Sequence, residues 1–223
     1  MNYPKWEDLL VKFCKIGDMD ELEKLIKWYP KIDIQYHNGE AFRSACYRNR
    51  LGIVKYLMET FPNIDYSQWY EDVLINTRDN NLQVAEFLID KIQDNNLIEN
   101  VFIEACRIGN LQIAKMLLIK FPNINYHVND ERLFRRACSG GYLDLVQWLV
   151  ENFTDIDYHS CNDDAFKNAC LYKHLSIVKL LLNIFSENNY RINIEKLFGD
   201  NYSKSKKVPE WLKQNFLETP VLF

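Results

Sequence analysis

Apolar residues recur at helical spacing in short segments along the chain, and polar residues separate one segment from the next. In the stretch FRSAC, Phe42, Ala45 and Cys46 stand at i, i+3 and i+4, which places them on one face of a short helix. After the polar residues 48–50 a second apolar stripe follows, made of Leu51, Val54, Leu57, Met58 and Phe61. The pattern therefore predicts two short helices joined by a tight turn.

The first helix carries a mark that recurs at a nearly constant interval. The pair Ala-Cys occurs four times, at 45–46, 105–106, 137–138 and 169–170. Phe13-Cys14 stands 32 residues before the first pair, and Asn76-Thr77 stands 31 residues after it. The marks therefore define six frames.

The second helix carries its own mark in register with the first. Its leucines are 32, 31, 29, 32 and 32 residues apart, at Leu25, Leu57, Leu88, Leu117, Leu149 and Leu181. An extended segment follows, because Pro62 and Pro122 end two of the helices and the next residues are β-branched and aromatic, as in Ile64-Asp65-Tyr66. Each unit is thus a helix, a turn with Gly109 or Gly140-Gly141 in two of the repeats, a second helix and an extended loop.

This unit resembles the ankyrin repeat, which has about 33 residues and an extended segment between helix pairs. The second-helix sequence Leu-x-Ile-Val-Lys-x-Leu-Leu at 175–182 is close to the ankyrin consensus, as is the Ala-small pair before it. The resemblance covers about residues 6–193. It implies an all-α, ankyrin-type α-solenoid of about six helix-turn-helix repeats with extended inter-repeat loops and a C-terminal cap.

The marks place the repeat boundaries. We expect six repeats within residues 1–193, at approximately 6–38, 39–69, 70–98, 99–130, 131–162 and 163–193. Residues 194–223 lack the Ala-Cys pair but contain Val-Pro-Glu-Trp-Leu at 208–212. The last residue of this segment, Leu212, stands 31 residues after Leu181 and so continues the leucine mark. We therefore expect 194–223 to be a degenerate capping repeat.

Three departures from the family pattern change what the resemblance implies. The Thr-Pro-Leu-His opening is replaced by Glu-Ala-Phe-Arg at 40–43 and Asp-Ala-Phe-Lys at 164–167, so the hydroxyl and imidazole that tie neighbouring first helices are missing. The third repeat has Asn76-Thr77 in place of Ala-Cys and a short exit loop at 93–96, which predicts a stunted loop there. The Phe-Pro-x-Ile-Asp-Tyr loops are similar to those of divergent ankyrin-repeat proteins of large DNA viruses of amoebae.

The charge composition of the chain argues against two classes of partner. The 223 residues carry a formal net charge of -4 without a basic run, which argues against nucleic acid and anionic membranes as partners. No apolar stretch approaches the length of a membrane span, and the N-terminus lacks the features of a signal peptide. We expect a monomer in the cytoplasm, in the host cytoplasm if the protein is viral.

The residues capable of chemistry favour a structural interpretation. Five cysteines occupy one repeat position and predict buried free thiols, so Cys161 in a loop is the single candidate for a reactive thiol. His127 and His159 lack the close ligand pair of a zinc site, and we expect them to bond to neighbouring backbone. Acidic pairs such as Asp163-Asp164 are interpreted as helix caps. With no catalytic motif in the chain, we expect neither an enzyme nor a cofactor nor a metal site.

The resemblance places a binding surface on the concave face of the repeats. Ankyrin loop tips and the residues after the Ala-small pair line that face, and the aromatic and arginine residues at these positions are types enriched in binding hot spots. By position they are Tyr36, Tyr47, Arg48, Trp69, Arg78, Arg107 and Tyr172. The resemblance implies a noncatalytic protein-protein interaction module, with a host protein as partner if the protein is viral. The alternative is an adaptor whose C-terminal segment recruits a ubiquitin ligase or other host machinery.

Overall fold

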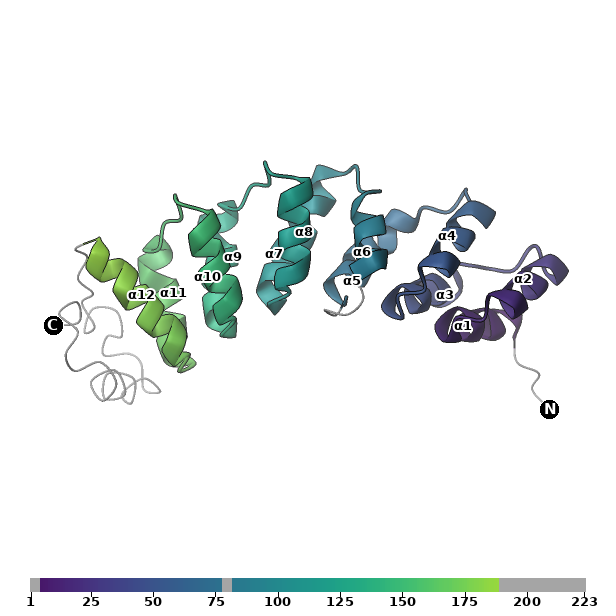
Figure 1. The fold of residues 1–223 in the computed structure, drawn as a ribbon, viewed down its shortest axis with the longest axis horizontal. Coiled ribbons are helices and arrows are strands. Elements are labelled where there is room, and N and C mark those ends of the chain that lie inside the picture. The colour runs from purple at the N-terminus through teal and green to yellow at the C-terminus, as the bar shows by residue number, and fades with distance from the viewer. Residues whose placement is uncertain (1–4, 78–81, 189–223) are drawn as a thin grey trace. The chain divides into compact units, whose positions relative to one another are not determined.

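The structure, a computed structural model, describes residues 5–77 and 82–188, which form helices and loops without a β-strand (Figure 1). The helices are α1 Trp6–Ile16, α2 Met19–Trp28, α3 Tyr36–Tyr47, α4 Leu51–Thr60, the 3₁₀ helix η1 Tyr66–Trp69, α5 Tyr70–Ile75, α6 Leu82–Ile89, α7 Asn95–Ile108, α8 Leu111–Lys120, α9 Val128–Gly140, α10 Leu143–Asn152, α11 Ser160–Leu171 and α12 Leu175–Glu187. The predicted all-α class is confirmed. In each repeat an odd-numbered first helix precedes an even-numbered second helix.

The chain divides into two compact units. Unit 1 comprises residues 1–102 and 112–124, and unit 2 comprises residues 103–111 and 125–223. Helices α1–α6 thus belong to unit 1 and α9–α12 to unit 2, while α7 and α8 contribute to both.

The turn inside each helix pair follows a rule that links it to the repeat cysteine. The third residue after each of the five repeat cysteines has a positive φ: Gly17 (88°), Asn49 (53°), Gly109 (78°), Gly141 (77°) and Lys173 (59°). A left-handed residue reverses the chain after the first helix, and glycine and asparagine adopt this conformation at the lowest cost. The predicted tight turn therefore has a specific backbone basis at one position per repeat.

The Ala-Cys pairs are buried on the first helices, as predicted. Ala45, Ala105, Ala137 and Ala169 are completely buried, and Cys14, Cys106, Cys138 and Cys170 are too, while Cys46 is 3% exposed. Helix α1 packs against α3 in unit 1, and α9 packs against α11 in unit 2. Small side chains at this contact allow a close approach, so a larger residue would overpack it by about 1–3 kcal/mol.

The leucine mark of the second helices is also buried. Leu57, Leu88, Leu117, Leu149 and Leu181 are 0% exposed, and Leu25 is 4% exposed. Burial of one such side chain contributes about 1.5–3 kcal/mol. The Ala-Cys mark therefore identifies core residues of the first helices, and the leucine mark identifies core residues of the second helices.

The third repeat departs from the others where its sequence does. Its first helix, α5, ends at Ile75 and has only six residues, after the 3₁₀ helix η1. Residues 90–94 connect α6 to α7, whereas the longer segments 29–35, 121–127 and 153–159 connect α2 to α3, α8 to α9 and α10 to α11. The segment 61–65, between α4 and the 3₁₀ helix η1, is as short as 90–94. The expectation of a shortened loop after the third repeat is confirmed.

The last described helix is longer than its counterparts. Helix α12 has 13 residues, compared with 10 in α4, α8 and α10, because no proline or loop begins at Phe185. Ile184 is 9% exposed, although the equivalent residues Thr60, Lys120 and Asn152 are all exposed. The predicted cap at 194–223 lies outside the described residues.

Candidate partner-binding surface

The residues predicted to bind a partner differ widely in exposure. Tyr172 is 62% exposed, and Arg48 and Arg107 are exposed as well. Tyr36 and Tyr47 are half-buried. Arg78 lies outside the described residues. The remaining candidate, Trp69, differs most from the expectation because it is buried.

Trp69 belongs to the core of unit 1. It is 2% exposed, its ring centroid lies 5.6 Å from that of Phe42, and its Nε1 donates to Oδ1 of Asn38 at 3.1 Å. Gly39 makes room for the indole, because a Cβ at Gly39 would lie 2.3 Å from a Trp69 ring atom. The expectation that Trp69 offers a surface contact is therefore wrong for this structure. The physical reason is the missing side chain at Gly39, which sequence spacing alone did not connect with Trp69.

Tyr47 is held by a carboxylate of the next repeat. Its hydroxyl donates to Oδ2 of Asp72, which also accepts from Nη1 of Arg43 at 3.1 Å. Burial, followed by the hydrogen bond to Asp72, raises the pKa of Tyr47 to about 12. The phenol thus helps to join two repeats and presents only part of its ring to solvent.

An arginine in each unit links neighbouring repeats in the same way. Arg43 Nε donates to the carbonyl of Asn38 at 3.0 Å, and Arg135 Nε donates to the carbonyl of Asp130 at 2.8 Å. The Nη1 atoms form ion pairs with an acid on the next first helix, Asp72 at 3.1 Å and Asp164 at 2.8 Å. These contacts take the place of the hydroxyl and imidazole that are missing from the opening of the first helix.

The sequence contained a signal for this link. Phe42-Arg43 and Phe134-Arg135 occupy equivalent positions, and each has an acid 29 residues later. Charge-assisted bonds of this kind are stronger than neutral ones, and the arginine side chains are only 24% and 21% exposed. The link therefore fixes the orientation of the first helices.

The first helices α3 and α11 begin with three consecutive left-handed residues. They are 37–39 in α3 and 161–163 in α11, and Asp130 and Glu131 of α9 have the same conformation. Left-handed backbone costs about 1–2 kcal/mol per residue without glycine. The surrounding contacts must offset this cost, and in unit 2 they involve histidines.

The two loop histidines of unit 2 bind carboxylates, which corrects the expected backbone contacts. His159 Nδ1 lies 2.6 Å from Oδ1 of Asp163, and His127 Nδ1 bonds to Oε1 of Glu131. Both acids are buried, Asp163 at 8% and Glu131 at 5% exposure, because the left-handed turns direct them inward. A buried carboxylate needs such a partner, which explains why these histidines stand four residues before the acids.

Asp155 connects His127 to the next loop. His127 Nε2 lies 3.2 Å from Oδ2 of Asp155, and the hydroxyl of Tyr126 donates to Oδ1 of the same residue. The hydrogen bond with Glu131 raises the pKa of His127, with a further contribution from Asp155. The Tyr126 hydroxyl and then His127 lower the pKa of Asp155.

The acids interpreted as helix caps are engaged in other contacts. Asp163 and Asp164 bind His159 and Arg135, and α11 has no side-chain cap hydrogen bond at its N-terminus. Asp157 does accept from the backbone N–H of His159, at 3.0 Å. The carboxylates of Asp163 and Asp164 thus have side-chain partners, and their role as helix caps stays a prediction.

The exposed side of α9 and α11 forms a polar and aromatic surface. Arg132 and Arg136 are exposed on one side of α9, opposite the buried Phe134, Ala137 and Cys138. Tyr172 is exposed at the end of α11, which packs against α9. We use the name first-helix face for the exposed residues on or directly after the first helices of each unit, which include Arg48, Arg107, Arg132, Arg136 and Tyr172.

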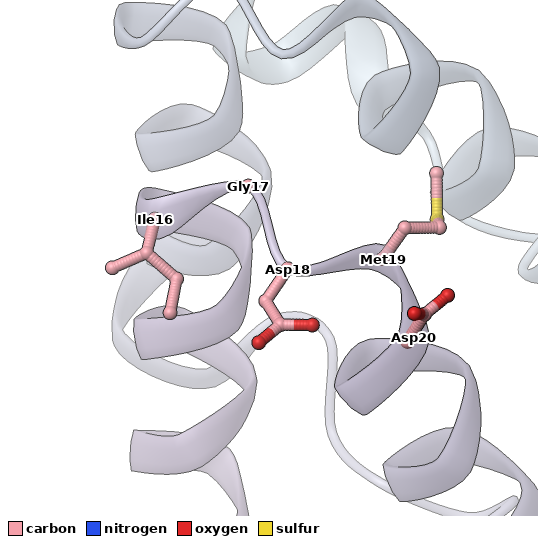
Figure 2. Close-up of a pocket in the computed structure, with 5 residues that line it drawn as sticks. All are labelled: Ile16, Gly17, Asp18, Met19 and Asp20. Atoms are coloured by element: carbon pink, nitrogen blue, oxygen red, sulfur yellow. The ribbon is translucent and has the colours of Figure 1, made fainter.

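Unit 1 has a surface hollow whose lining residues are not arranged like those of a binding site. It has a volume of about 530 Å³ and lies over the turn between α1 and α2, where Ile16, Gly17, Asp18, Met19 and Asp20 line it. Figure 2 shows that these side chains do not converge on one point. Asp18 is engaged as a helix cap, because its carboxylate accepts from the N–H of Glu21 at 3.1 Å.

The cysteines divide into five buried thiols and one exposed thiol, as predicted. Cys161 is exposed, whereas the five repeat cysteines are buried. Burial raises the pKa of Cys14 and of Cys106 to about 12, and it also raises the pKa of Cys138 and Cys170. The repeat thiols therefore stay protonated and serve as small apolar side chains. Over the residues that the structure describes, no cluster of His, Cys, Asp and Glu could hold a metal ion.

Comparison with known families agrees with the architecture. Residues 103–196 match the family model of ankyrin repeats, in three copies. A search of curated proteins gives no match to the chain. Across residues 5–77 and 82–188, no helix has the length and apolar character needed to cross a membrane. Ankyrin repeats indicate a protein-protein interaction module. The chain thus has an all-α repeat fold of the ankyrin type, and its residues 103–196 are similar to three ankyrin repeats.

Proposed function

We propose that the protein binds a protein partner through the first-helix face and carries out no chemical reaction itself. The observation that carries the proposal is the exposure of Tyr172 on a repeat whose neighbouring Ala169 and Cys170 are fully buried. A large aromatic side chain that is 62% exposed beside a rigid core offers apolar area at low entropic cost. Arg48 is exposed at the equivalent position of unit 1.

The exposure of the candidate residues supports some of them as parts of this surface more than others. Tyr172, Arg48 and Arg107 are exposed and remain candidates, although Arg107 also pairs with Glu104 at 2.5 Å. Tyr36 and Tyr47 offer only part of their surface, and Trp69 is excluded by its burial. Six cysteines without a disulfide among them support a reducing location such as the cytoplasm.

The test compares single substitutions on the two sides of the helix pairs. Tyr172→Ala probes unit 2 and Arg48→Ala probes unit 1, and Ile119→Ala is the matched control because Ile119 is 83% exposed on the second helix α8. Each tagged variant is used to capture proteins from cells that express the chain, and the recovered proteins are quantified. The proposal expects a specific protein to be lost with Tyr172→Ala or Arg48→Ala and retained with Ile119→Ala.

Equal recovery of every protein by all variants would contradict the proposal. If the captured protein is lost with Ile119→Ala alone, the binding surface lies on the second helices and the proposal is contradicted. Thermal unfolding of each variant controls for folding, and we expect changes within about 0.5 kcal/mol because all three residues lie on the surface.

A further inference from the structure

Helix α9 exposes two like charges on one side. Arg132 and Arg136 are four residues apart and both are exposed, whereas Leu133 and Phe134 between them are buried. Like charges at this spacing destabilise a helix. The arrangement therefore lowers the stability of the free protein slightly.

No other described first helix has cations at both positions. The equivalent pairs are Asp8 and Lys12 in α1, Glu40 and Ser44 in α3, Glu71 and Ile75 in α5, Asn100 and Glu104 in α7, and Asp164 and Asn168 in α11. All five of these pairs contain an acid, and Lys12 is the one cation among them. The α9 pair thus differs in charge from the repeat pattern.

The acids nearest in the repeat pattern already have cationic partners. Asp164 accepts from Arg135 at 2.8 Å, and Glu104 accepts from Arg107 at 2.5 Å. Within the described part of the chain, neither Arg132 nor Arg136 forms an ion pair with an acid. Both guanidinium groups are therefore available to carboxylates from another molecule.

The neighbouring helix adds an aromatic residue and a third cation. Tyr172 and Lys173 follow α11, which packs against α9, and both are exposed. Arginine and tyrosine are the residue types most enriched in binding hot spots, and a guanidinium can bind a carboxylate through two hydrogen bonds. A surface with this composition fits a short acidic segment that contains an apolar side chain.

We propose that the α9–α11 part of the first-helix face, defined by Arg132, Arg136 and Tyr172, binds a segment of a partner protein rich in Asp and Glu. This inference rests on the proposed protein-binding function and names the chemistry of the partner. Because the whole chain has a net charge of -4, attraction acts only near the arginines and falls steeply with salt.

The test uses the full chain and a fluorescent synthetic peptide that alternates glutamate with glycine and contains one central tyrosine. Anisotropy is measured at about 0.05 M and about 0.3 M salt, where screening lengths differ more than twofold. We expect saturable binding at low salt that weakens at least about tenfold in the variant Arg132→Glu with Arg136→Glu. The matched control, Lys12→Glu with Lys15→Glu on α1, makes the same change of charge at exposed positions and should weaken binding by less than about twofold.

Three outcomes would overturn the inference. They are an equal loss in both double variants, absence of binding by the wild-type chain at low salt, and tighter binding of a thymidine oligonucleotide of equal length than of the peptide. The neutral variant Arg132→Gln with Arg136→Gln, checked by thermal unfolding, separates loss of charge from loss of fold. If cellular capture depends on Tyr172 but not on the two arginines, the proposed function stands and the acidic partner does not.

Discussion

Arg135 on α9 donates to Asp164 on α11 at 2.8 Å, and this contact joins two consecutive repeats of unit 2. Arg43 and Asp72 form the same contact in unit 1, at 3.1 Å. Each arginine also binds a carbonyl of the left-handed turn in its own repeat. One side chain thus holds the start of its own first helix and the start of the next one.

The Arg135–Asp164 contact should contribute measurably to stability. We expect a coupling free energy of about 1 kcal/mol from a double-mutant cycle of Arg135→Ala and Asp164→Ala, because both side chains are shielded more than an exposed surface pair. Urea unfolding of the four proteins measures it. Arg136→Ala is the control, since Arg136 is exposed one residue further along and should change stability by less than about 0.5 kcal/mol. A coupling indistinguishable from zero would show that the contact does not join the repeats.

Gly39 and Gly52 should respond in opposite directions to alanine. Gly39 has φ 69°, and an added Cβ would lie 2.3 Å from a Trp69 ring atom, so Gly39→Ala should destabilise unit 1 by about 2–4 kcal/mol through strain and overpacking. Gly52 lies inside α4, where a Cβ would meet Met19 Cε at a relaxed 3.6 Å. Gly52→Ala should stabilise by about 0.5–1 kcal/mol. Chemical unfolding of both variants is the measurement, and a neutral Gly39→Ala would contradict the packing of Trp69 against this turn.

His127 should titrate above its ordinary pKa, and its partners should control the shift. Glu131→Gln removes the largest cause and should lower the His127 pKa most, while Asp155→Asn should lower it less. NMR titration of the imidazole Cε1–H signal in the three proteins measures the order. The reverse order, or no change in either variant, would contradict the contacts in the loop.

The same shift gives a pH dependence of stability with a definite sign. Because the folded-state pKa of His127 is raised, its contribution is fully present below the unfolded value of about 6.5 and is lost as pH rises through the folded value. The difference in unfolding free energy between wild type and His127→Gln should therefore be largest at mildly acidic pH and decrease toward higher pH. A difference that grows with pH would have the wrong sign.

The sequence predicts a cap at residues 194–223, and its removal tests that prediction. Ile184 is buried where Thr60 is exposed at the equivalent position, so we expect removal of 194–223 to destabilise unit 2 by about 2–5 kcal/mol. Ile184→Thr should cost about 1 kcal/mol in the full chain and almost nothing in the truncated one. Unfolding and light scattering of the four proteins test this. A truncated chain that keeps its stability and solubility would favour the adaptor role for this segment.

The periodicity of the sequence was sufficient to predict the helix pairs, because burial of Ala, Cys and Leu follows directly from helical spacing. The shortened loop after the third repeat was predictable because the interval from Leu88 to Leu117 is 29 residues, compared with 31 or 32 in the other repeats. The left-handed residue after each repeat cysteine could also have been predicted from the sequence at four of the five positions. Gly17, Asn49, Gly109 and Gly141 are of the types that tolerate positive φ.

The surface was harder to predict, because it depends on contacts between side chains of different repeats. Trp69 was expected at the surface and fills the space left by Gly39, a relation that no period reveals. The histidines of unit 2 were assigned to backbone contacts, whereas His159 binds the carboxylate of Asp163 and His127 binds that of Glu131. Arg43 and Arg135 repeated in the sequence with their acids, and this pairing could have been found by comparing the repeats position by position.

The reactivity of the six thiols tests the central claim, that the repeat cysteines lie between packed first helices. Under native conditions a thiol-specific reagent should modify Cys161 rapidly, and Cys161→Ser should abolish this fast reaction. The other five thiols should react only as fast as the protein opens, and all should react in denaturant. Rapid modification of two or more of Cys14, Cys46, Cys106, Cys138 and Cys170 in the folded protein would contradict the architecture on which the binding surface depends.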